Sequence, residues 1–469
     1  MVSFSIADIL IIVLFFASVI AVGFIIGRRS TNDAEDYLLS GRKVGLLLFI
    51  LTNVATWYGG ILGVGEFVYR YGIVSWFTQG FPYYVFAFLF AILFAKKIRE
   101  ASLFTIPDKL GLIYGKKVGL LSAVIVFVLV SPAPYLLMTG SLISLIFGTN
   151  IFLSLIIGLM LSLLYLLRGG FRSDLYTDAI QFFVMFIGFI IIFIYSLNSL
   201  GDFTFLQENL PQEYLRLTGN APPGFILVWF LIALWTFADP GFHQRCYAAK
   251  SGNVAVKGII ISIFFWFLFD ALTTVTGLYA RASIPNLEYP AMSYPLLAEM
   301  ILPSGIKGIF YAALFATIMS TLNSFLFLSG TTISRDFFYK AFHVTIESNL
   351  KQFTIYGLLI SGFLSVLLAY FIPSVIEIWY TIGSIFIPGI IIPVVSSYYN
   401  KFKINEKIIL IEMISSVAGG FIWFLIRRKF SNSFLTEIEP MIVGLSISII
   451  IHTIGLLLKP VPFEQRKQH

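Results

Sequence analysis

Apolar runs separated by short polar segments cover most of the chain. Thirteen of these runs are close to the roughly 20 residues that a helix needs to cross the hydrocarbon core of a bilayer. The pattern therefore predicts an all-α polytopic membrane protein with about 13 transmembrane helices, in a single domain over residues 1–469. The predicted spans are 6–26, 44–69, 74–95, 118–147, 151–167, 176–197, 225–241, 259–280, 308–329, 353–371, 375–397, 408–426 and 441–458.

The composition agrees with a protein embedded in lipid. Hydrophobic residues make up 58% of the chain and charged residues 12%, and the mean hydropathy is +0.91. A soluble domain of this length with such values would aggregate. The single cysteine, Cys246, excludes internal disulfides and cysteine-cluster metal sites, and the four histidines are far apart in the sequence. No nucleotide-binding, zinc-protease or nucleophile motif is present, so we expect neither an enzyme nor an organic cofactor.

The distribution of positive charge predicts an orientation in the membrane. The net charge of +7 does not indicate nucleic acid here, because basic residues concentrate in the cytoplasmic loops of membrane proteins. The first span is followed, not preceded, by Arg28 and Arg29, which places the N-terminus outside and the C-terminus in the cytoplasm of a multi-pass plasma-membrane protein. Of the 31 Lys and Arg residues, seven then fall in outward loops: Arg70, Arg216, Arg281, Lys307, Arg427, Arg428 and Lys429. The last three do not fit this concentration of basic residues on the cytoplasmic side, so the topology stays open around them.

Two predicted spans, five apart, are interrupted by residues that break helices. The second contains four glycines at positions 59, 60, 63 and 65, and the seventh contains the segment WTFADP, residues 235–240. Broken helices in membranes are tolerated where they line a cavity, and paired breaks mark the binding sites of transporters. If spans two to six and seven to eleven are the two halves, each has five helices, and because five is an odd number the second half is expected to be inverted relative to the first. The alternative is that the glycines only let neighbouring helices approach closely.

The ninth span carries a polar stripe. Thr317, Ser320, Thr321 and Ser324 follow the i, i+3, i+4, i+7 spacing that places side chains on one face of a helix. Hydroxyl and carbonyl oxygens are the ligands that a small hard cation prefers, and they bring no fixed charge into lipid. The stripe is therefore a candidate ion site. The alternative is that these hydroxyls bond to carbonyls one turn earlier or allow close helix packing.

Five ordered motifs make the chain resemble the sodium:solute symporter family, which includes proline, pantothenate, sialic acid and sugar cotransporters. They are EDYLLSGRKVG after the first span, FTIPDKLGLIYGKK after the third, GGFRSDLYTDAIQ entering the sixth, DPGFHQRCYAAKS after the seventh, and YPLLAEMILPSGIKGIFYAALFATIMSTLNS through the ninth. The resemblance implies a LeuT-like fold of five plus five inverted helices. The repeats would cover residues about 44–198 and 224–398, with peripheral helices at 6–27, 408–427 and 441–458.

The resemblance also implies residues for the coupling ion. Sodium is expected between the second and ninth spans, held by carbonyls of Ala55 and Tyr58 and by Thr317, Ser320 and Thr321. Thr317 and Tyr58 differ from the residues that are commoner in the family at these positions. If only their backbone carbonyls bind the ion, neither difference affects the site. In relatives the acid that matches Asp178 lies on the inner sodium path and sometimes binds a second ion. The alternative for Asp178 is a helix N-terminal charge near Arg172.

By the same resemblance, the solute lies beside the two breaks. The expected lining residues are Trp57, Gly59, Gly60, Gln79, Trp235 and Thr236, although the aromatic residues and Gln79 could instead serve packing. Asp270 lies inside an apolar span and must face a partner, a cavity or a proton. Glu66 can simply pair with Arg70 one turn later. No Lys or Arg lies near the middle of a predicted span, which favours an amino acid, another zwitterion or a cation over a free anion.

These features predict a sodium-coupled secondary active symporter that imports a small organic solute by alternating access. The expected partners are the lipid bilayer, sodium and the solute. A proton-coupled transporter using Asp178 or Asp270 is the main alternative, and uptake driven by pH instead of sodium would identify it. A membrane sensor is disfavoured because only about ten residues follow the last span, too few for a signalling domain. An ion channel would not need paired broken helices. The solute, the number of sodium ions and the oligomeric state stay open.

Overall fold

The computed structural model describes residues 2–28, 33–342, 350–427, 429 and 438–458. In this part of the chain the regular elements are helices, and one isolated parallel bridge joins Val44 to Ala249. Arg29 and Arg428 of the predicted charge pattern, and His343 and His469, lie outside the described residues. The first half contains α1 (Ile6–Gly27), α2 (Ala34–Leu39), α3 (Leu46–Ala55), α4 (Ile61–Tyr71), α5 (Phe81–Phe90), α6 (Lys96–Ala101), α7 (Ile106–Tyr114), α8 (Lys116–Leu129), α9 (Ala133–Phe147) and α10 (Ile151–Leu200).

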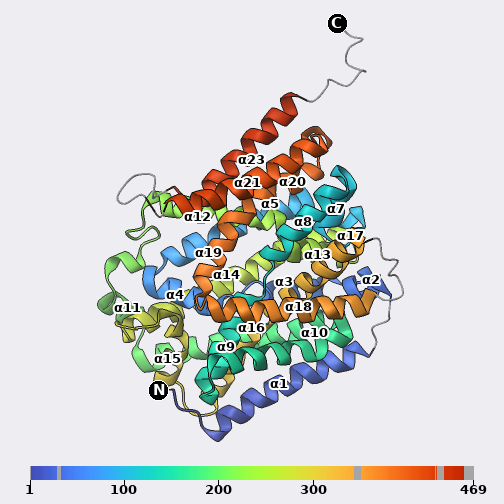
Figure 1. Ribbon diagram of the computed structural model, residues 1–469. Helices are drawn as coiled ribbons and strands as arrows, with labels where there is room; N and C mark the ends of the chain where they lie inside the picture. Colours follow the sequence, from blue (N-terminus) through green and yellow to red (C-terminus); the bar gives the residue numbers. More distant parts are fainter. Residues whose placement is uncertain (1, 29–32, 343–349, 428, 430–437, 459–469) are drawn as a thin grey trace.

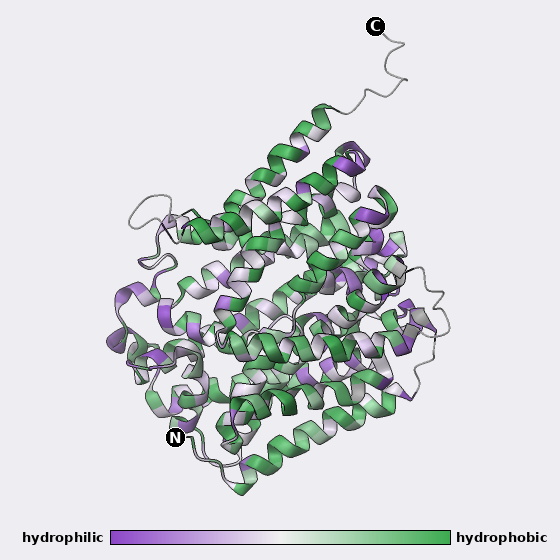
Figure 2. Cartoon of the chain, in the orientation of Figure 1, coloured by the Kyte–Doolittle hydropathy of each residue, from purple (hydrophilic) through white to green (hydrophobic). Residues whose placement is uncertain are grey.

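The second half begins with a short surface helix and continues with further long helices. It contains α11 (Phe203–Asn209), α12 (Pro223–Ile232), α13 (Pro240–Ala248), α14 (Gly252–Ser283), α15 (Ser293–Ile301), α16 (Ile306–Thr331), α17 (Lys340–Phe342), α18 (Leu350–Phe371), α19 (Val375–Phe386), α20 (Ile391–Ser397), α21 (Glu406–Arg427) and α23 (Pro440–Leu457). Hydrophilic residues gather at two opposite ends of this bundle, and hydrophobic helices fill the space between them (Figure 2). This distribution is the one that a bilayer imposes on a polytopic protein.

The described helices agree with a polytopic membrane protein. Ten are long and apolar enough to cross a membrane, and the pair α19 and α20, bent by 42°, makes an eleventh. Two shorter apolar helices, Leu46–Ala55 and Ile151–Leu164, lie in the predicted second and fifth spans. The all-helical fold class is thus confirmed, whereas the number of thirteen and the inverted repeat stay predictions.

Both predicted helix breaks are present. In the first, α3 ends at Ala55 and α4 begins at Ile61. In the second, α12 tightens into a 3₁₀ segment, Ala233–Ala238, before Asp239 caps the N-terminus of α13. The predicted seventh span was too short, because the chain continues as helix beyond Pro240 to Ala248. Proline stands at the first position of that helix, where its missing N–H costs nothing.

A third interruption was not predicted. The predicted fourth span is divided into α8 and α9, because the helix stops at Leu129 and restarts at Ala133. Pro132 caps the second piece, and a proline in a helix interior removes a backbone hydrogen bond. The predicted fifth and sixth spans both lie in α10, in which two helices meet at a kink at Gly170; the φ of +55° at this residue is non-helical and favours glycine.

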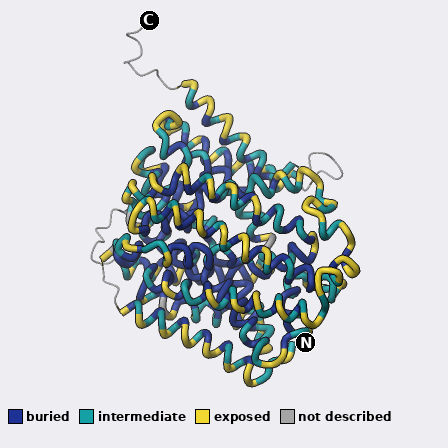
Figure 3. The backbone as a smooth tube through the Cα atoms, turned by 180° about the vertical axis from the view of Figure 1, so that it is seen from behind, coloured by how far each residue is buried: buried dark blue, intermediate teal, exposed yellow. Residues whose placement is uncertain are grey.

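Helix α16 forms the centre of the bundle. Every residue from Phe310 to Ser324 is buried, and the helix packs against α1, α10 and α18. Figure 3 shows the buried residues concentrated in the interior, with exposed residues along the outer helices. Helix α1 lies along one edge of the molecule, and α21 and α23 pack on each other at the opposite edge (Figure 1). The polar stripe of α16 therefore faces protein, not lipid.

Candidate functional site

The first helix break is joined to α16 by two hydroxyl groups. Ser320 donates a hydrogen bond from Oγ to the carbonyl oxygen of Ala55 at 2.8 Å, and Thr321 donates to the carbonyl oxygen of Thr56 at the same distance. These carbonyls have lost regular helical partners because α3 ends there. Two backbone and two side-chain oxygens thus meet between the second and ninth predicted spans. Oxygen atoms of these kinds are ligands for a hard cation.

The other residues predicted for sodium lie around this contact. Thr317 donates to the carbonyl of Ala313 at 2.7 Å, one turn earlier in its own helix, which is the alternative that the sequence left open for such residues. Tyr58 turns its hydroxyl toward the carbonyl of Trp266, at 2.7 Å. The structure therefore brings Ala55, Ser320 and Thr321 together. Thr56, whose carbonyl binds Thr321, was not predicted.

Asp178 lies in a separate buried cluster. Its carboxylate accepts a hydrogen bond from Thr52 and lies 3.6 Å from Nη2 of Arg245 on α13. Arg172, the partner considered from sequence, pairs with Asp36. Sequence reasoning expected no Lys or Arg near the middle of a span and did not foresee this contact, because α13 continues the seventh span beyond its predicted end and carries Arg245, which is 3% exposed, to Asp178.

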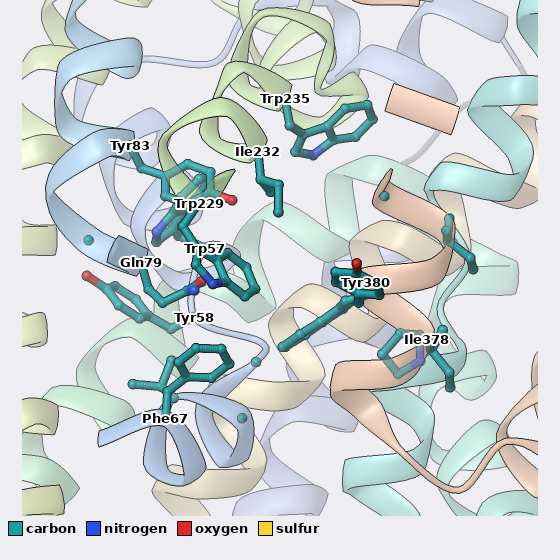
Figure 4. Close-up of a pocket in the computed structure, with 18 of the residues that line it drawn as sticks. Trp57, Tyr58, Phe67, Gln79, Tyr83, Trp229, Ile232, Trp235, Ile378 and Tyr380 are labelled. Carbon is teal, nitrogen blue, oxygen red and sulfur yellow. The ribbon is translucent and has the colours of Figure 1, made fainter. Parts of the chain in front are cut away.

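A cavity of about 250 Å³ opens between the two breaks (Figure 4). Its walls come from α4, α5 and the π-helical turn Trp76–Gly80 before it, from α12 with the 3₁₀ segment, and from α19. In Figure 4, Trp57, Gln79 and Tyr83 lie on one side of the cavity and Ile378 and Tyr380 on the other. Aromatic rings dominate the lining, which contains Trp57, Tyr58, Phe67, Trp76, Tyr83, Tyr135, Trp229, Trp235, Phe325, Trp379 and Tyr380.

Most residues predicted for the solute line this cavity. Trp57, Gly60, Gln79, Trp235 and Asp270 are among its walls. The other two lie beside it: a Cβ atom at Gly59 would collide with Thr321, and the buried hydroxyl of Thr236 donates to the carbonyl of Ala233 at 2.9 Å.

Several lining residues were not predicted. Sequence reasoning missed Trp76, Trp229, Trp379 and Asp239. For Asp239 a signal existed, because an acid directly before Pro240 and inside an apolar run is a helix N-cap within the membrane.

Two carboxylates face the cavity. Asp270 accepts a hydrogen bond from Tyr84, which itself accepts one from Trp76 Nε1 at 3.2 Å. Asp239 accepts from the backbone N–H groups of Gly241 and Phe242 at 2.6 and 3.1 Å. No Lys, Arg or His is among the described residues that line the cavity. The cavity therefore offers two carboxyl groups and aromatic faces, and aromatic faces suit a ligand that carries positive charge.

On one side the cavity adjoins a more open vestibule, at the end that the charge pattern predicts to be outside. This space is lined by Glu66, Arg70 and Glu377, and it shares Phe67 and Tyr380 with the cavity. Arg70 pairs with Glu66 at 2.9 Å, which confirms the pairing considered from sequence. The cavity and the vestibule thus meet at Phe67 and Tyr380.

Towards the opposite end of the bundle, where Figure 1 shows α7 and α17, lies an ion-pair cluster, called here the inner ion-pair cluster, made of Asp108, Arg335, Asp336 and Lys340. Asp108 lies 2.6 Å from Arg335 and 2.5 Å from Lys340, and Asp336 lies 3.0 Å from Arg335. Burial alone would raise the pKa of Asp108, but Arg335 and then Lys340 outweigh it and hold that pKa at about 2. The cluster joins α7 to the π-helical segment Thr332–Tyr339 that follows α16 and to α17, on the side that the basic loops predict to be cytoplasmic.

Comparison with known proteins gives matches over most of the chain. The model of the sodium:solute symporter family matches residues 37–415. The High-affinity choline transporter 1 of Drosophila melanogaster is 26% identical over 400 residues, covering 80% of this chain and 64% of that protein. The chain thus spans less than two thirds of that relative's length. The sodium/pantothenate symporter of Escherichia coli (strain K12) is also 26% identical, over 75% of this chain and 76% of that protein.

Among solved structures, the fold is similar to that of a Na⁺-coupled sialic acid symporter described in a substrate-bound, outward-open state. The TM-score is 0.82 at 16% sequence identity, and the match covers 97% of this chain and 99% of that one. At this identity the similarity concerns the fold alone.

Proposed function

The chain belongs to the sodium:solute symporter family, and on that premise we propose that it imports a small organic cation, or a zwitterion with a substituted ammonium group, together with sodium. Alternating access would carry both across the membrane. At a membrane potential of about −100 mV one sodium ion gains about 2.3 kcal/mol on entry. A roughly tenfold sodium gradient adds about 1.4 kcal/mol, so one ion supports accumulation of about a few hundredfold.

One observation favours a cationic solute: the chemistry of the cavity lining. Five of the seven tryptophans of the chain line it, at positions 57, 76, 229, 235 and 379, together with Asp239 and Asp270. The negative face of an aromatic ring attracts an ammonium group, and cages of such rings bind quaternary ammonium ions. A carboxylate would find no cationic side chain among the described lining residues. The choline transporter of Drosophila among the relatives is consistent with this chemistry.

Within the cavity, we assign the solute to the walls formed by Trp57, Gly60, Gln79 and Trp235, with Asp270 opposite the ammonium group. Gly59 and Thr236 lie at the two helix breaks, beside the cavity and outside its lining. Trp229 and Trp379, which were not predicted from the sequence, would complete an aromatic box around the ammonium group, together with Trp57 and Trp235.

We assign sodium to the contact between the first break and α16. Ala55 and Tyr58 would supply carbonyls, and Ser320 and Thr321 would turn their hydroxyls from these carbonyls to the ion. Thr317 borders the site one turn away. Asp178, whose carboxylate accepts a hydrogen bond from Thr52, would lie on the inward path of the ion.

Ligand-dependent stability of the purified protein tests this function without a transport assay. A ligand that binds only the folded state raises its stability by mass action. We expect sodium to raise the melting temperature where potassium does not, and choline to raise it further where glucose and pantothenate do not. Stabilisation by pantothenate or glucose but not choline would contradict the assignment of the solute class. An effect of pH in place of sodium would point to proton coupling.

A further inference from the structure

The chain enters the first broken span through a left-handed turn just ahead of α3. Ser40, Gly41 and Arg42 have consecutive φ angles of +53°, +64° and +52°. Glycine adopts this region freely, whereas the Cβ atom of any other residue comes too close to the following carbonyl oxygen. Residues with side chains keep such a conformation only where their surroundings hold them in it. The turn therefore carries backbone strain at Ser40 and at Arg42.

The side chain of Arg42 holds this turn in place. Its guanidinium group donates to the carbonyl oxygens of Ser102 and Leu103, both at 3.1 Å, and to that of Tyr247 at 3.3 Å. Its Nε lies 3.1 Å from a carboxylate oxygen of Glu35, and only 10% of the side chain is exposed. The first two carbonyls follow α6, whereas Glu35 lies on α2 and Tyr247 on α13. Arg42 thus joins the turn to three other segments.

The same end of α13 is also joined to the chain before α3, through the isolated parallel bridge. The backbone N–H of Val44 donates to the carbonyl of Ala248 at 3.1 Å, and that of Lys250 donates to the carbonyl of Val44 at 2.9 Å. Helix α3 ends at the first break and α13 begins at the second. The bridge therefore connects these two half-helices at the ends that lie away from the breaks, so a rotation of one about this end moves the other.

We propose that Arg42 is the positioning residue of a hinge. It holds the turn Ser40–Arg42 in the left-handed conformation, and α3 and α13 swing about this turn as one unit when the predicted cytoplasmic side opens. The inference rests on the proposed alternating-access transport. Because Ala55 at the other end of α3 accepts from Ser320 on α16, the swing separates the oxygens assigned to sodium. Bound sodium and Arg42 oppose the swing, whereas relaxation of the strained turn favours it.

The reactivity of a reporter cysteine tests the hinge. Thr331→Cys places a thiol in the small inner cavity, a space of about 10 Å³ that Pro240 and Gln244 of α13 also line. In the purified full chain, in potassium buffer, its reaction with a membrane-impermeant thiol reagent reports how often α13 moves away. Arg42→Lys keeps the charge but loses the fork of donors, and we expect the reaction to become about fivefold faster than with Arg42 intact.

A second substitution separates strain from packing. Ser40→Gly removes the strain at one position of the turn, so in the Arg42→Lys background it should slow the reaction back towards the original rate. Ser40→Ala is the matched control, because it removes the same hydroxyl group, to which Arg172 donates at 3.4 Å, but keeps the Cβ atom. It should leave the reaction fast. If Arg42 only held the fold together, glycine would loosen the turn further and accelerate the reaction.

The outcomes distinguish the hinge from the proposed function. An unchanged reaction in Arg42→Lys, or equal effects of the Gly and Ala substitutions at Ser40, overturns the hinge. If Arg42→Lys does not fold, the single variants decide: Ser40→Gly should react more slowly than the unsubstituted turn and Ser40→Ala should not, and equal rates overturn the hinge. Sodium in place of potassium should slow the reaction in every variant. Absence of this sodium effect contradicts the proposed sodium site, whereas the order of the variants still tests the hinge.

Discussion

The hydroxyl of Ser320 donates to the carbonyl oxygen of Ala55 across 2.8 Å, so the buried central helix is fastened to the first helix break. Because these two oxygens are close in space but 265 residues apart in sequence, an ion bound between them would hold two distant segments together. Binding of sodium would then change which side of the cavity is open.

Removing the hydroxyls of this contact should weaken sodium binding. In Ser320→Ala, Thr321→Val both side-chain oxygens are lost, and we expect the sodium concentration for half-maximal uptake to rise about tenfold or more, equivalent to about 1.4 kcal/mol. Ser329→Ala is the matched control, because Ser329 is a buried serine of the same helix whose hydroxyl bonds to the carbonyl of Leu326 and to Ser361 on α18, away from the break. Unchanged sodium dependence in the double variant would remove the ion from α16.

Substitutions at two adjacent glycines should distinguish the sodium site from the solute site. A Cβ atom at Gly59 would collide with Thr321, whereas one at Gly60 would collide with the ring of Trp379. We therefore expect Gly59→Ala to weaken mainly sodium binding and Gly60→Ala mainly solute binding, each measured by thermal stabilisation. Gly45→Ala is the control, since no packing neighbour lies within 4 Å of the position that the new methyl group would take. Equal losses of both ligands in both variants would contradict this separation.

The aromatic box should bind the ammonium group through its ring faces. Trp57→Leu and Trp379→Leu keep apolar volume but remove the ring, so choline affinity should fall by about tenfold, within the range of about 0.5–2 kcal/mol for one cation–π contact. Trp→Phe at the same positions should restore part of it. Trp423→Phe is the control, because Trp423 lies on α21 and does not line the cavity. Equal affinity in the Leu and Phe variants would argue against cation–π binding.

The charge of Asp270 should matter only for a charged ligand. Asp270→Asn keeps the shape of the side chain and a carbonyl oxygen for Tyr84, but it removes the negative charge. Choline affinity should fall by about tenfold or more, an electrostatic loss of about 1.4 kcal/mol. The neutral carbon analogue 3,3-dimethylbutan-1-ol should lose less than about twofold in competition binding. A similar loss for both compounds would show that the substitution damages the cavity, not the charge.

The inner ion-pair cluster should keep the predicted cytoplasmic side closed. Asp108→Asn removes the carboxylate shared by Arg335 and Lys340, so a reporter cysteine at Thr331, in the small inner cavity, should react several times faster with a membrane-impermeant thiol reagent. Buried Cys246, the only native cysteine, gives the background rate.

The pKa of Asp108 sets the pH range of this effect. Its pKa of about 2 in the folded protein lies below its ordinary value of 3.8, so its stabilisation is present above that value and is lost as the pH falls toward 2. Between about pH 5 and 9 the difference between wild type and variant should therefore be constant. A difference that disappears within this range would contradict the ionised carboxylate.

The sequence indicated the parts of the candidate site that break local rules, although it did not assign Asp239 to the cavity lining. Clustered glycines, the Asp239–Pro240 step and Asp270 inside an apolar run are unfavourable in a membrane helix, so each one indicates a reason beyond packing. Trp76, Trp229 and Trp379 break no such rule, because tryptophan is common at membrane interfaces and only the fold decides which rings face the cavity. Arg245 was missed because a proline such as Pro240 often marks the end of a helix, although proline is also a good first residue of a new one.

The central claim, sodium-driven import of an organic cation, is tested most directly in proteoliposomes with the purified protein. Uptake of labelled choline is measured with an inward sodium gradient, with potassium in place of sodium, and with a pH gradient alone, at a potential clamped with potassium and valinomycin. The account predicts accumulation above equilibrium only with the sodium gradient, and its loss when unlabelled choline but not glucose is added in excess. Accumulation driven by the pH gradient without sodium, or sodium-driven uptake of glucose or pantothenate with none of choline, would contradict it.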